Sequence, residues 1–471
     1  MFALDLGQGL AWTCVHKRKS MTTKTQLAKL GLFDAKVPRY TSYPTAPHFK
    51  NDVTPEIFGE WISAIKPDSQ ISLYIHVPFC RRLCWFCACR TQGTASASPV
   101  AAYVETLKQE LAILKAHLPS GVSLSRLHWG GGTPTLLEPG MMEDLAGAIF
   151  DVAPMADQGE FSVEIDPCEV DDARLAVLSK AGMNRASIGV QDFDDEIQKT
   201  IGRIQGYDVT KEAVDMIRAH GVYSLNADIL FGLPHQNQAR ITESVQKLLS
   251  LSPDRVALYG YAHVPWMAKR QQMIPSDALP TPQERLELFE TARKLFLWDN
   301  YEEIGIDHFA TKEDGLSVAQ KAGKLRRNFQ GYTDDLAEAL IGVGASSISR
   351  FPQGYAQNAP ATSAHTGRIR DGNFTTTRGH VFTEEDKLRG RLIEALMCDF
   401  RIDSTEIMQT FKISPVRLQE LYKPVIEGFP GMVEITPEGL SIPVEARPLT
   451  RMMARALDAY DMDSAGHSSA I

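Results

Sequence analysis

Four of the chain's seven cysteines lie within ten residues, in the segment Cys80-Arg-Arg-Leu-Cys84-Trp-Phe-Cys87-Ala-Cys89. Thiolates are soft ligands, and they select zinc, copper(I) or iron–sulfur clusters over hard cations. The C-x3-C-x2-C spacing can wrap one short loop around a single cubane, with three sulfurs on three irons and the fourth iron open. A structural zinc site usually takes two ligand pairs set well apart, and no second pair follows here. We therefore favour an iron–sulfur cluster over zinc, and over disulfides, which are rare in a chain that looks intracellular.

Composition and charge narrow the classes of function. A length of 471 residues is enough for one large domain and a smaller one. The formal net charge of -9 argues against nucleic acid as the main partner. No apolar run approaches membrane-spanning length, and residues 1–20 lack the order of a signal peptide. We expect a cytoplasmic protein without membrane association, in which residues 1–20 form a disordered extension.

Apolar, β-branched runs alternate with amphipathic helical patterns over most of the chain. Such alternation is typical of a parallel sheet with right-handed crossovers. We therefore predict an α/β fold in which six or seven units form a partial or full parallel (β/α) barrel, with a doubly wound open sheet as the alternative. The predicted strands are Ile71–Val77, Arg126–Trp129, Phe161–Asp166, Ala186–Gln191, Leu225–Phe231, Val256–Tyr261 and the weaker Glu303–His308.

Polar residues interrupt the ends of five successive predicted strands. The cysteine segment follows the first strand, and the run Gly130-Gly131-Gly132-Thr133 follows the second; the next three strands carry Glu164, Gln191 and Asp228. Ligands of parallel α/β proteins gather at the carboxyl ends of strands, so five such features in register predict a binding site. The glycine run matches neither a dinucleotide fingerprint nor a Walker loop.

The segments on either side of the barrel have their own character. Residues 21–70 are interpreted as a leader, in which Pro38–Thr45 is an extended piece lying over another surface. Residues 71–380 would form the barrel, with glycine- and polar-rich binding loops covering its mouth after residue 310. Residues 381–471 predict a small, mainly helical domain with a hairpin-like piece. This domain resembles a winged helix, which raises DNA binding as an alternative, but without a dense Lys/Arg face a packing role is favoured.

The cysteine loop after the first strand and the glycine run after the second resemble the radical S-adenosylmethionine superfamily. From about Pro38 to the C-terminus, the chain further resembles the oxygen-independent coproporphyrinogen III oxidases. Cys89 and the leader separate these oxidases from heme-chaperone relatives, and Ala88 stands where the oxidases usually have glycine. The motifs that carry the likeness are Leu73–Cys80, Leu127–Thr135, Gly189–Phe193, Tyr261–His263, Gly305–Ala310 and Arg327–Tyr332.

The resemblance implies a 4Fe–4S cluster bound by Cys80, Cys84 and Cys87, together with two S-adenosylmethionine molecules. Cys89 matches a residue that is needed for activity without binding the cluster. The residues that match contacts to the S-adenosylmethionine on the cluster are Tyr74, Gly131, Glu164 and Ile348. Those that match contacts to the second molecule are Phe86, Gly132, Thr133, Gln191, Arg203, Asp228 and Ala262.

The implied activity is oxidative decarboxylation of two propionate side chains of coproporphyrinogen III to vinyl groups, giving protoporphyrinogen IX in heme biosynthesis. The cofactors would supply a 5′-deoxyadenosyl radical, which takes a hydrogen atom from the propionate β-carbon. Because the substrate has four carboxylates, Arg39, Arg326 and Arg327 are candidate anchors. An electron donor and an electron acceptor, both unidentified, are also implied, and nothing demands more than a monomer. A heme chaperone and a radical enzyme acting on another tetrapyrrole stay open as alternatives.

Overall fold

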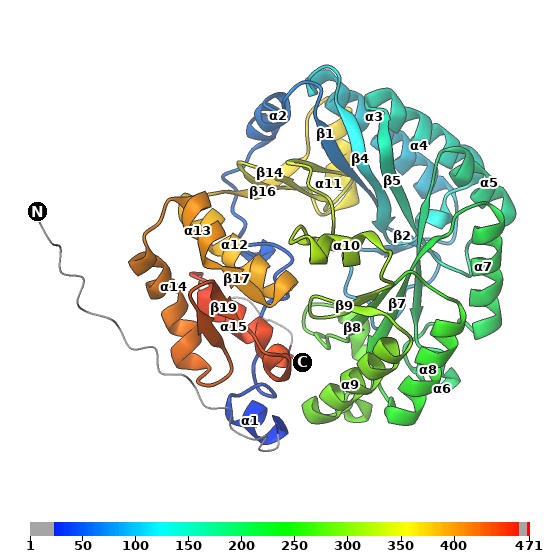
Figure 1. Ribbon diagram of the computed structural model, residues 1–471. Coiled ribbons are helices and arrows are strands. Elements are labelled where there is room, and N and C mark those ends of the chain that lie inside the picture. The colour runs from blue at the N-terminus through cyan, green and yellow to red at the C-terminus, as the bar shows by residue number, and fades with distance from the viewer. Residues whose placement is uncertain (1–22, 461–468) are drawn as a thin grey trace, which may run out of the picture.

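One mixed sheet of 12 strands organises the computed structural model, which describes residues 23–460 and 469–471 (Figure 1). Our expectation for residues 1–20 lies outside the described residues. The middle of the sheet is parallel, in the order β13-β1-β4-β5-β6-β7-β8. These strands span Leu340–Val343, Gln70–Val77, Ser123–Gly131, Met155–Ile165, Arg185–Gln191, Ser224–Phe231 and Arg255–Gly260.

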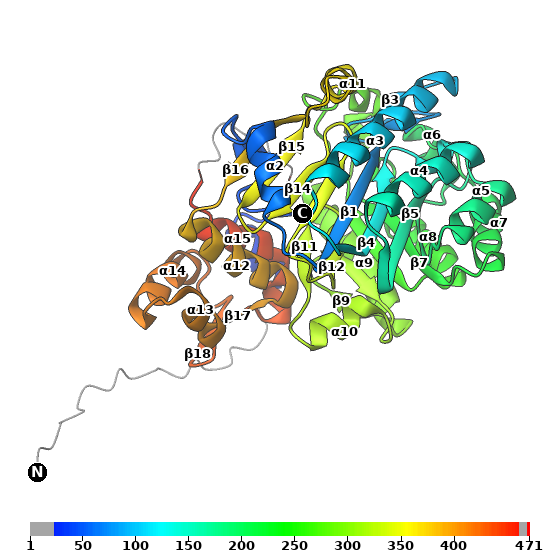
Figure 2. The same ribbon diagram turned by 90° about the horizontal axis from the view of Figure 1, so that it is seen from above.

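The six predicted strands from Ile71 to Tyr261 are confirmed as β1 and β4 to β8, although β5 begins earlier than predicted. In β6 and β7 fully buried residues alternate with half-buried ones, as expected when one face of a strand meets helices and the other lines a hollow. Helices cover the outer face of the parallel strands (Figures 1 and 2). They are α3 (Ser98–His117), α4 (Pro139–Val152), α5 (Asp172–Lys180), α6 (Asp195–Thr200), α7 (Tyr207–Ala219), α8 (Gln238–Ser250) and α9 (Pro282–Trp298).

The prediction of a single strand over Glu303–His308 is wrong. The chain turns at Gly305, where φ is +53°, and forms two short strands that pair antiparallel, β9 (Glu302–Ile304) and β10 (His308–Ala310). β10 also pairs antiparallel with β8, so the parallel series ends there. Glycine adopts this left-handed backbone without the strain of a Cβ, which is why the turn can interrupt an otherwise strand-like run.

The chain after residue 310 forms several strands, whereas we expected binding loops. β13 pairs in parallel with β1, and β14 to β16 extend the sheet antiparallel from it. These strands are only three to six residues long, and β13 joins the sheet by pairing with β1, which is far away in sequence, so the apolar runs used for the longer strands did not identify them. The elements are α10 (Gly315–Lys321), β11 (Arg326–Asn328), β12 (Gly331–Thr333), β14 (Ile348–Phe351), β15 (Gly354–Asn358), α11 (Thr362–Arg370) and β16 (Thr376–Val381).

The sheet does not close on itself. The strand order leaves β16 and β9 at its two edges, so the described residues form a partial (β/α) barrel rather than a full one. A further short pair of strands, β2 (Phe79–Cys80) and β3 (Gln92–Gly93), brackets the cysteine loop. Among the residues that the structure describes, no helix is both long and apolar enough to cross a membrane.

The C-terminal region has its own hydrophobic core, which includes part of the leader. Tyr40 and Tyr43 of the leader are buried in it; Tyr40 Oη donates to Asp458 Oδ2 at 2.9 Å, and the Ala459 N–H donates to Tyr43 Oη at 3.0 Å. The predicted helices and hairpin of this region are confirmed, while the boundaries at residues 20, 70 and 380 stay predictions. The elements are α1 (Thr23–Lys29), α2 (Pro55–Ser63), α12 (Glu384–Asp399), β17 (Arg401–Asp403), α13 (Ser404–Phe411), α14 (Pro415–Gly428), β18 (Glu434–Thr436), β19 (Gly439–Ser441) and α15 (Thr450–Leu457).

A buried carboxylate on α3 ties the antiparallel strands to the barrel. Glu110 Oε2 accepts from the Gly344 N–H at 2.9 Å and lies 2.8 Å from His365 Nε2. Glu110 Oε1 accepts from Asn358 Nδ2 at 2.8 Å. Since a buried charge is tolerated only when it is paired and hydrogen-bonded, these contacts hold the loop after β13 in a single position.

We expect Glu110→Ala to lower the free energy of unfolding by about 3–5 kcal/mol, because it leaves a buried histidine, an amide and a backbone N–H without their acceptor. Glu105→Ala, on the same helix, removes an exposed ion pair with Lys108 and should cost at most about 1 kcal/mol. Urea unfolding of both variants measures the difference. Equal effects would contradict the role assigned to Glu110.

Candidate active site

The cysteine loop leaves the end of β1 and is anchored from two sides. On one side, the Trp85 N–H donates to Ile201 O at 2.9 Å, and the Trp85 ring covers Gly202, where a Cβ would come within 2.8 Å of it. On the other side, Gln271 donates to Phe86 O at 2.7 Å. These contacts fix the loop against the neighbouring strand-end loops.

The glycine run lies directly against the backbone that enters the cysteine loop. The Gly132 N–H donates to Val77 O and the Thr133 N–H to Phe79 O, both at 2.8 Å. A Cβ on Gly132 would lie 2.5 Å from Phe79 O, and Gly131 has φ +110°. Both positions therefore require glycine, one for the close approach of two backbones and the other for its left-handed conformation.

The four residues predicted to contact the first S-adenosylmethionine lie together on the inner face of the sheet. The Gly131 N–H donates to Glu164 Oε2 at 3.0 Å. The Tyr74 ring stacks on His128, with 5.7 Å between centroids, and His128 Nε2 lies 3.4 Å from Glu164 Oε1. Ile348 begins β14, beside the β13 strand that pairs with β1 at Tyr74.

Three residues predicted for the second molecule meet around Gly189 of β6. Arg203 Nη2 donates to Gly189 O at 3.0 Å, and Arg203 Nη1 lies 3.6 Å from Cys84 Sγ. A Cβ on Gly189 would come within 2.8 Å of Gln191 Nε2. Asp228 is the ladder partner of Gly189 on β7, so all three side chains belong to the same end of the sheet as the cysteines.

The other predicted members of this second group reach the same end by different routes. Gln271 Nε2 donates to both Phe86 O and Ala262 O, at 2.7 and 3.0 Å, and so joins the cysteine loop to the loop after β8. Burial raises the pKa of the Cys80 thiol, and a hydrogen bond with the Thr133 side chain partly offsets this rise. The structure thus brings the predicted S-adenosylmethionine contacts to the same end of the sheet as the cysteine loop.

The fourth cysteine interacts with the third. The Cys89 N–H donates to Cys87 Sγ at 3.4 Å. A hydrogen bond from the Cys89 thiol lowers the pKa of Cys87 to about 6, and the same bond raises the pKa of Cys89. Of these two thiols Cys87 is therefore the more acidic, and the thiolate is the form that binds metal. With Cys80 and Cys84, and with the Arg203 guanidinium beside Cys84, this donor set fits an anionic iron–sulfur cluster.

Two carboxylates give the inner face an acidic patch. Burial, and then repulsion from Glu164, raise the pKa of Asp228 to about 7, although Asn226 Nδ2 donates to Asp228 Oδ1 at 3.0 Å. A cationic or hydroxyl-bearing ligand between the two carboxyl groups would relieve this repulsion. The amino group and ribose of S-adenosylmethionine have this chemistry.

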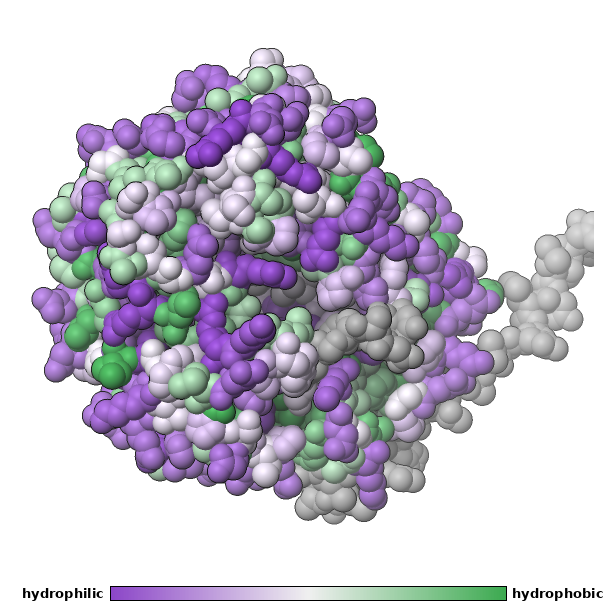
Figure 3. All heavy atoms as spheres, turned by 180° about the vertical axis from the view of Figure 1, so that it is seen from behind, coloured by the Kyte–Doolittle hydropathy of each residue, from purple (hydrophilic) through white to green (hydrophobic). Residues whose placement is uncertain are grey.

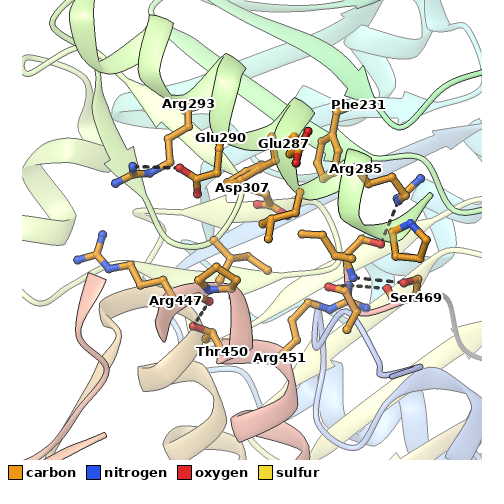
Figure 4. Close-up of a pocket in the computed structure, with 18 of the residues that line it drawn as sticks. Phe231, Arg285, Glu287, Glu290, Arg293, Asp307, Arg447, Thr450, Arg451 and Ser469 are labelled. Carbon is orange, nitrogen blue, oxygen red and sulfur yellow. Dashed lines mark hydrogen bonds and ion pairs between the residues drawn. The ribbon is translucent and has the colours of Figure 1, made fainter. Parts of the chain in front are cut away.

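Of the three candidate carboxylate anchors, Arg39 and Arg327 lie at one cavity and Arg326 does not. Arg39 Nη2 donates to Gly260 O at 2.7 Å, and Arg327 Nη1 lies 3.7 Å from Asp307 Oδ1. Both arginines line a cavity of about 890 Å³ (Figure 4). Arg326 does not line it, because its guanidinium donates to main-chain carbonyls of its own loop.

This cavity lies between the ends of β7 and β8, helix α9 and the C-terminal region. Ala262 lines it as well, so the cavity adjoins the loop predicted to contact the second S-adenosylmethionine. The space-filling view from behind shows a hollow near the middle of the molecule, with mostly hydrophilic residues around it (Figure 3).

Sequence reasoning missed several residues of the site. His128 had a usable signal, since its period-2 spacing from Gly130 places both on the same face of β4. Gln271 had none, because it acts from a short 3-10 helix, Lys269–Met273, well beyond its strand. Asp307 lay inside a quoted motif without an assigned role, and it became visible only through its contact with Arg327.

Comparison with known proteins agrees with this geometry. The sequence model of the Radical SAM superfamily matches residues 74–248, in agreement with the fold described above. The oxygen-independent coproporphyrinogen III oxidase of Paracoccus denitrificans is 66% identical over 451 residues, covering 96% of this chain and 100% of the relative. That of Cereibacter sphaeroides is 58% identical over 441 residues, covering 94% and 98%.

The solved structure of coproporphyrinogen III oxidase from Escherichia coli, described as a radical SAM enzyme, matches with a TM-score of 0.85 at 32% identity. The match covers 91% of this chain and 100% of that one. The chain belongs to the family of oxygen-independent coproporphyrinogen III oxidases, as its motifs indicated.

The close approach at Gly132 predicts the effect of adding one methyl group. We expect Gly132→Ala to lower the free energy of unfolding by about 1–3 kcal/mol, because the backbone at Phe79 has to move. Gly147→Ala is the matched control: it lies in α4 with open space around it, and should be neutral or stabilising by up to about 1 kcal/mol. Thermal unfolding that ranked the two variants equally would contradict the assignment.

The raised pKa of Asp228 predicts a pH dependence in the protein without cofactors. Its folded pKa, about 7, lies above the ordinary value of 3.8, so its contribution to stability is complete below pH 3.8 and is lost as the pH rises through 7. Asp228→Asn should therefore raise the melting temperature more at pH 8 than at pH 5. The exposed control Asp157→Asn should show no such difference. A shift for Asp228→Asn that is independent of pH would be evidence against the burial of its charge.

Proposed function

We propose that this chain oxidatively decarboxylates two propionate side chains of coproporphyrinogen III to vinyl groups, forming protoporphyrinogen IX in heme biosynthesis. The observation that carries the proposal is the convergence of the cysteine loop, the glycine run and the polar inner face at one end of the sheet. Membership of the oxygen-independent coproporphyrinogen III oxidases supports the choice of substrate.

In this proposal Cys80, Cys84 and Cys87 bind a 4Fe–4S cluster with one open iron. The reduced cluster and S-adenosylmethionine together supply radical chemistry that removes a hydrogen atom from an unactivated carbon. Arg203 lies beside Cys84, and the Cys89 N–H donates to Cys87 Sγ, so both sulfurs have a donor group next to them. Cys89 is a residue needed for turnover that does not bind the cluster.

Two S-adenosylmethionine molecules bind at adjacent places on the inner face. Tyr74, Gly131, Glu164 and Ile348 hold the one on the cluster, and their contacts with one another support a common site. The second is held by Phe86, Gly132, Thr133, Gln191, Arg203, Asp228 and Ala262. Two observations support the second site. Asp228 adds a carboxylate next to Glu164, and Gln271 joins Phe86 to Ala262 through hydrogen bonds to both carbonyls.

The chain's own residues orient the substrate and exclude water. Arg39 and Arg327 line the cavity beside this inner face, and planar guanidinium groups pair well with carboxylates. The partial barrel, the leader and the C-terminal region surround the reacting carbon, which protects a radical from water. Each new vinyl group requires the loss of one hydrogen atom, one CO2 and one electron.

The remaining parts of the proposal concern partners. The electron lost at each vinyl group goes to an unidentified acceptor, and an unidentified donor reduces the cluster. We place the enzyme in the cytoplasm, where thiols stay reduced and available as cluster ligands. It acts as a monomer, since nothing in the sequence demands a second subunit.

The activity test is direct. The anaerobically reconstituted protein, given coproporphyrinogen III, S-adenosylmethionine and a reductant, should release CO2 and form protoporphyrinogen IX. Tight heme binding without turnover would favour a heme chaperone instead. Turnover of a different tetrapyrrole, with coproporphyrinogen III left unchanged, would favour the other radical-enzyme alternative.

The division of the cysteines predicts two classes of variant. Cys80→Ser, Cys84→Ser and Cys87→Ser should each abolish the visible absorbance of the cluster and its iron content, because each removes a ligand. Cys89→Ser should keep both and lose turnover. Cys398→Ser, which changes a buried cysteine outside the cysteine loop, serves as the control and should leave the absorbance and iron content of the cluster unchanged. A Cys89→Ser protein without iron would indicate a four-thiolate site.

A further inference from the structure

Several arginines gather at the inner end of the cavity between α9 and the C-terminal region. The proposed function gives a role to Arg39 and Arg327 but none to Arg285. Arg285 projects from α9 into the cavity, and Figure 4 shows Arg285, Asp307 and Arg451 around one space. Arg39 enters the same space from the leader. Arg451 is occupied in holding chain segments together, since it donates to the carbonyls of Val37, Pro38, Ser469 and Ala470.

Arg39 and Arg285 meet at the end of β8. Arg39 Nη2 donates to Gly260 O at 2.7 Å, and a Cβ on Gly260 would lie 3.2 Å from Arg285 Nη2. A Cβ on Gly232, at the end of β7, would overlap Arg285 as well. Two strand ends thus carry glycine where the Arg285 guanidinium lies, and that guanidinium also stands 5.5 Å from the centre of the Phe231 ring.

Among residues 23–460 and 469–471, no ion pair joins Arg39 or Arg285 to a carboxylate side chain. Arg285 donates to the main-chain oxygens of Ile471 and Gly232, at 3.1 and 3.3 Å. Asp307 is already held by Arg327 and by His308, whose Nδ1 lies 2.7 Å from Asp307 Oδ1. Burial, followed by repulsion from Arg39, lowers the pKa of Arg285 to about 10.

Glu303 also lines the cavity, but it is held by arginines other than Arg39 and Arg285. Glu303 pairs with Arg293 at 2.7 Å and with Arg447 at 2.6 Å. The remaining walls include apolar side chains suited to the faces of pyrrole rings, namely Leu27, Phe231, Tyr261, Leu279, Phe289 and Ile306. A volume of about 890 Å³ is in the range of cavities that enclose large organic ligands.

We propose that Arg285, together with Arg39, forms a subsite for a propionate carboxylate that the reaction does not remove. The inference rests on the proposed function, in which two of the four carboxylates are retained. None of the cluster cysteines lines this cavity, and Ala262 is the one predicted cofactor contact among its described lining residues. A carboxylate bound at Arg285 is therefore displaced from the cysteine loop, which leaves the propionates on the other side of the macrocycle to reach the cofactors.

Porphyrin binding tests the subsite separately from catalysis. The probe is coproporphyrin III, the oxidised tetracarboxylate that cannot react, titrated into anaerobic holoenzyme and followed by fluorescence quenching. Arg285→Gln should weaken its binding about 10- to 100-fold, as expected for loss of a charge-assisted hydrogen bond. Lys294→Gln removes the same charge from an exposed position of α9 that also lines the cavity, and should change binding less than about twofold.

The tetramethyl ester of the probe supplies the second measurement. The unaltered protein should bind the free acid more tightly than the ester, and Arg285→Gln should lose most of this preference. Binding by Arg285→Gln equal to that by Lys294→Gln would overturn the subsite. If Arg285→Gln does not fold, Arg285→Lys replaces it in the test. This variant keeps the charge but loses the planar guanidinium, and unchanged binding of the probe would also overturn the subsite. Absence of CO2 release by the unaltered enzyme would instead overturn the proposed function.

Discussion

Two backbone hydrogen bonds between the end of β1 and the glycine run after β4 hold the site together. Gly132 and Thr133 donate to the carbonyls of Val77 and Phe79, the last residues before the cysteine loop. Because β1 and β4 are parallel neighbours, their carboxyl ends already lie at one edge of the sheet. The two bonds convert this proximity into a fixed backbone position, from which Gly131 also reaches Glu164 on β5.

Charge is sorted along the inner face of this sheet. The carboxylates Glu164 and Asp228 lie at the cofactor end, where ligands with amino and hydroxyl groups are expected. The arginines 39, 285 and 327 line the cavity toward the C-terminal region, where a substrate with several carboxylates is expected. Arg203 is the exception, and its place beside Cys84 suits an anionic cluster.

The sequence predicted the parallel strands well, for a physical reason. Buried parallel strands are continuous apolar runs, and polar residues at their ends stand out against them, as Glu164 and Asp228 do. β13 could not be predicted in this way, since Leu340–Val343 is short and becomes a central strand only by pairing with β1. The cavity could not be predicted from the sequence either. In the sequence, Arg285 is one of several charged residues on an amphipathic helix. The structure shows that its side chain points inward, into the space that Gly232 and Gly260 leave free because they have no side chain.

The leader and the C-terminal region both line the cavity, and they share one hydrophobic core although they lie at opposite ends of the chain. Tyr40 and Tyr43 are buried in the C-terminal core, which fixes the backbone next to Arg39, and the Arg39 side chain reaches the end of β8. The motifs identify the leader as characteristic of the family. They do not reveal its contact with the barrel, because Arg39 and Gly260 are far apart in sequence. Such contacts depend on the tertiary fold and leave no local pattern.

The central claim is that this site directs a radical from S-adenosylmethionine at a propionate β-carbon. Coproporphyrinogen III deuterated at the β-carbons of its propionates tests it most directly, with mass spectrometry of the nucleoside product. The account predicts one deuterium in the 5′-deoxyadenosine formed with each new vinyl group. Vinyl formation accompanied by 5′-deoxyadenosine without deuterium would contradict it.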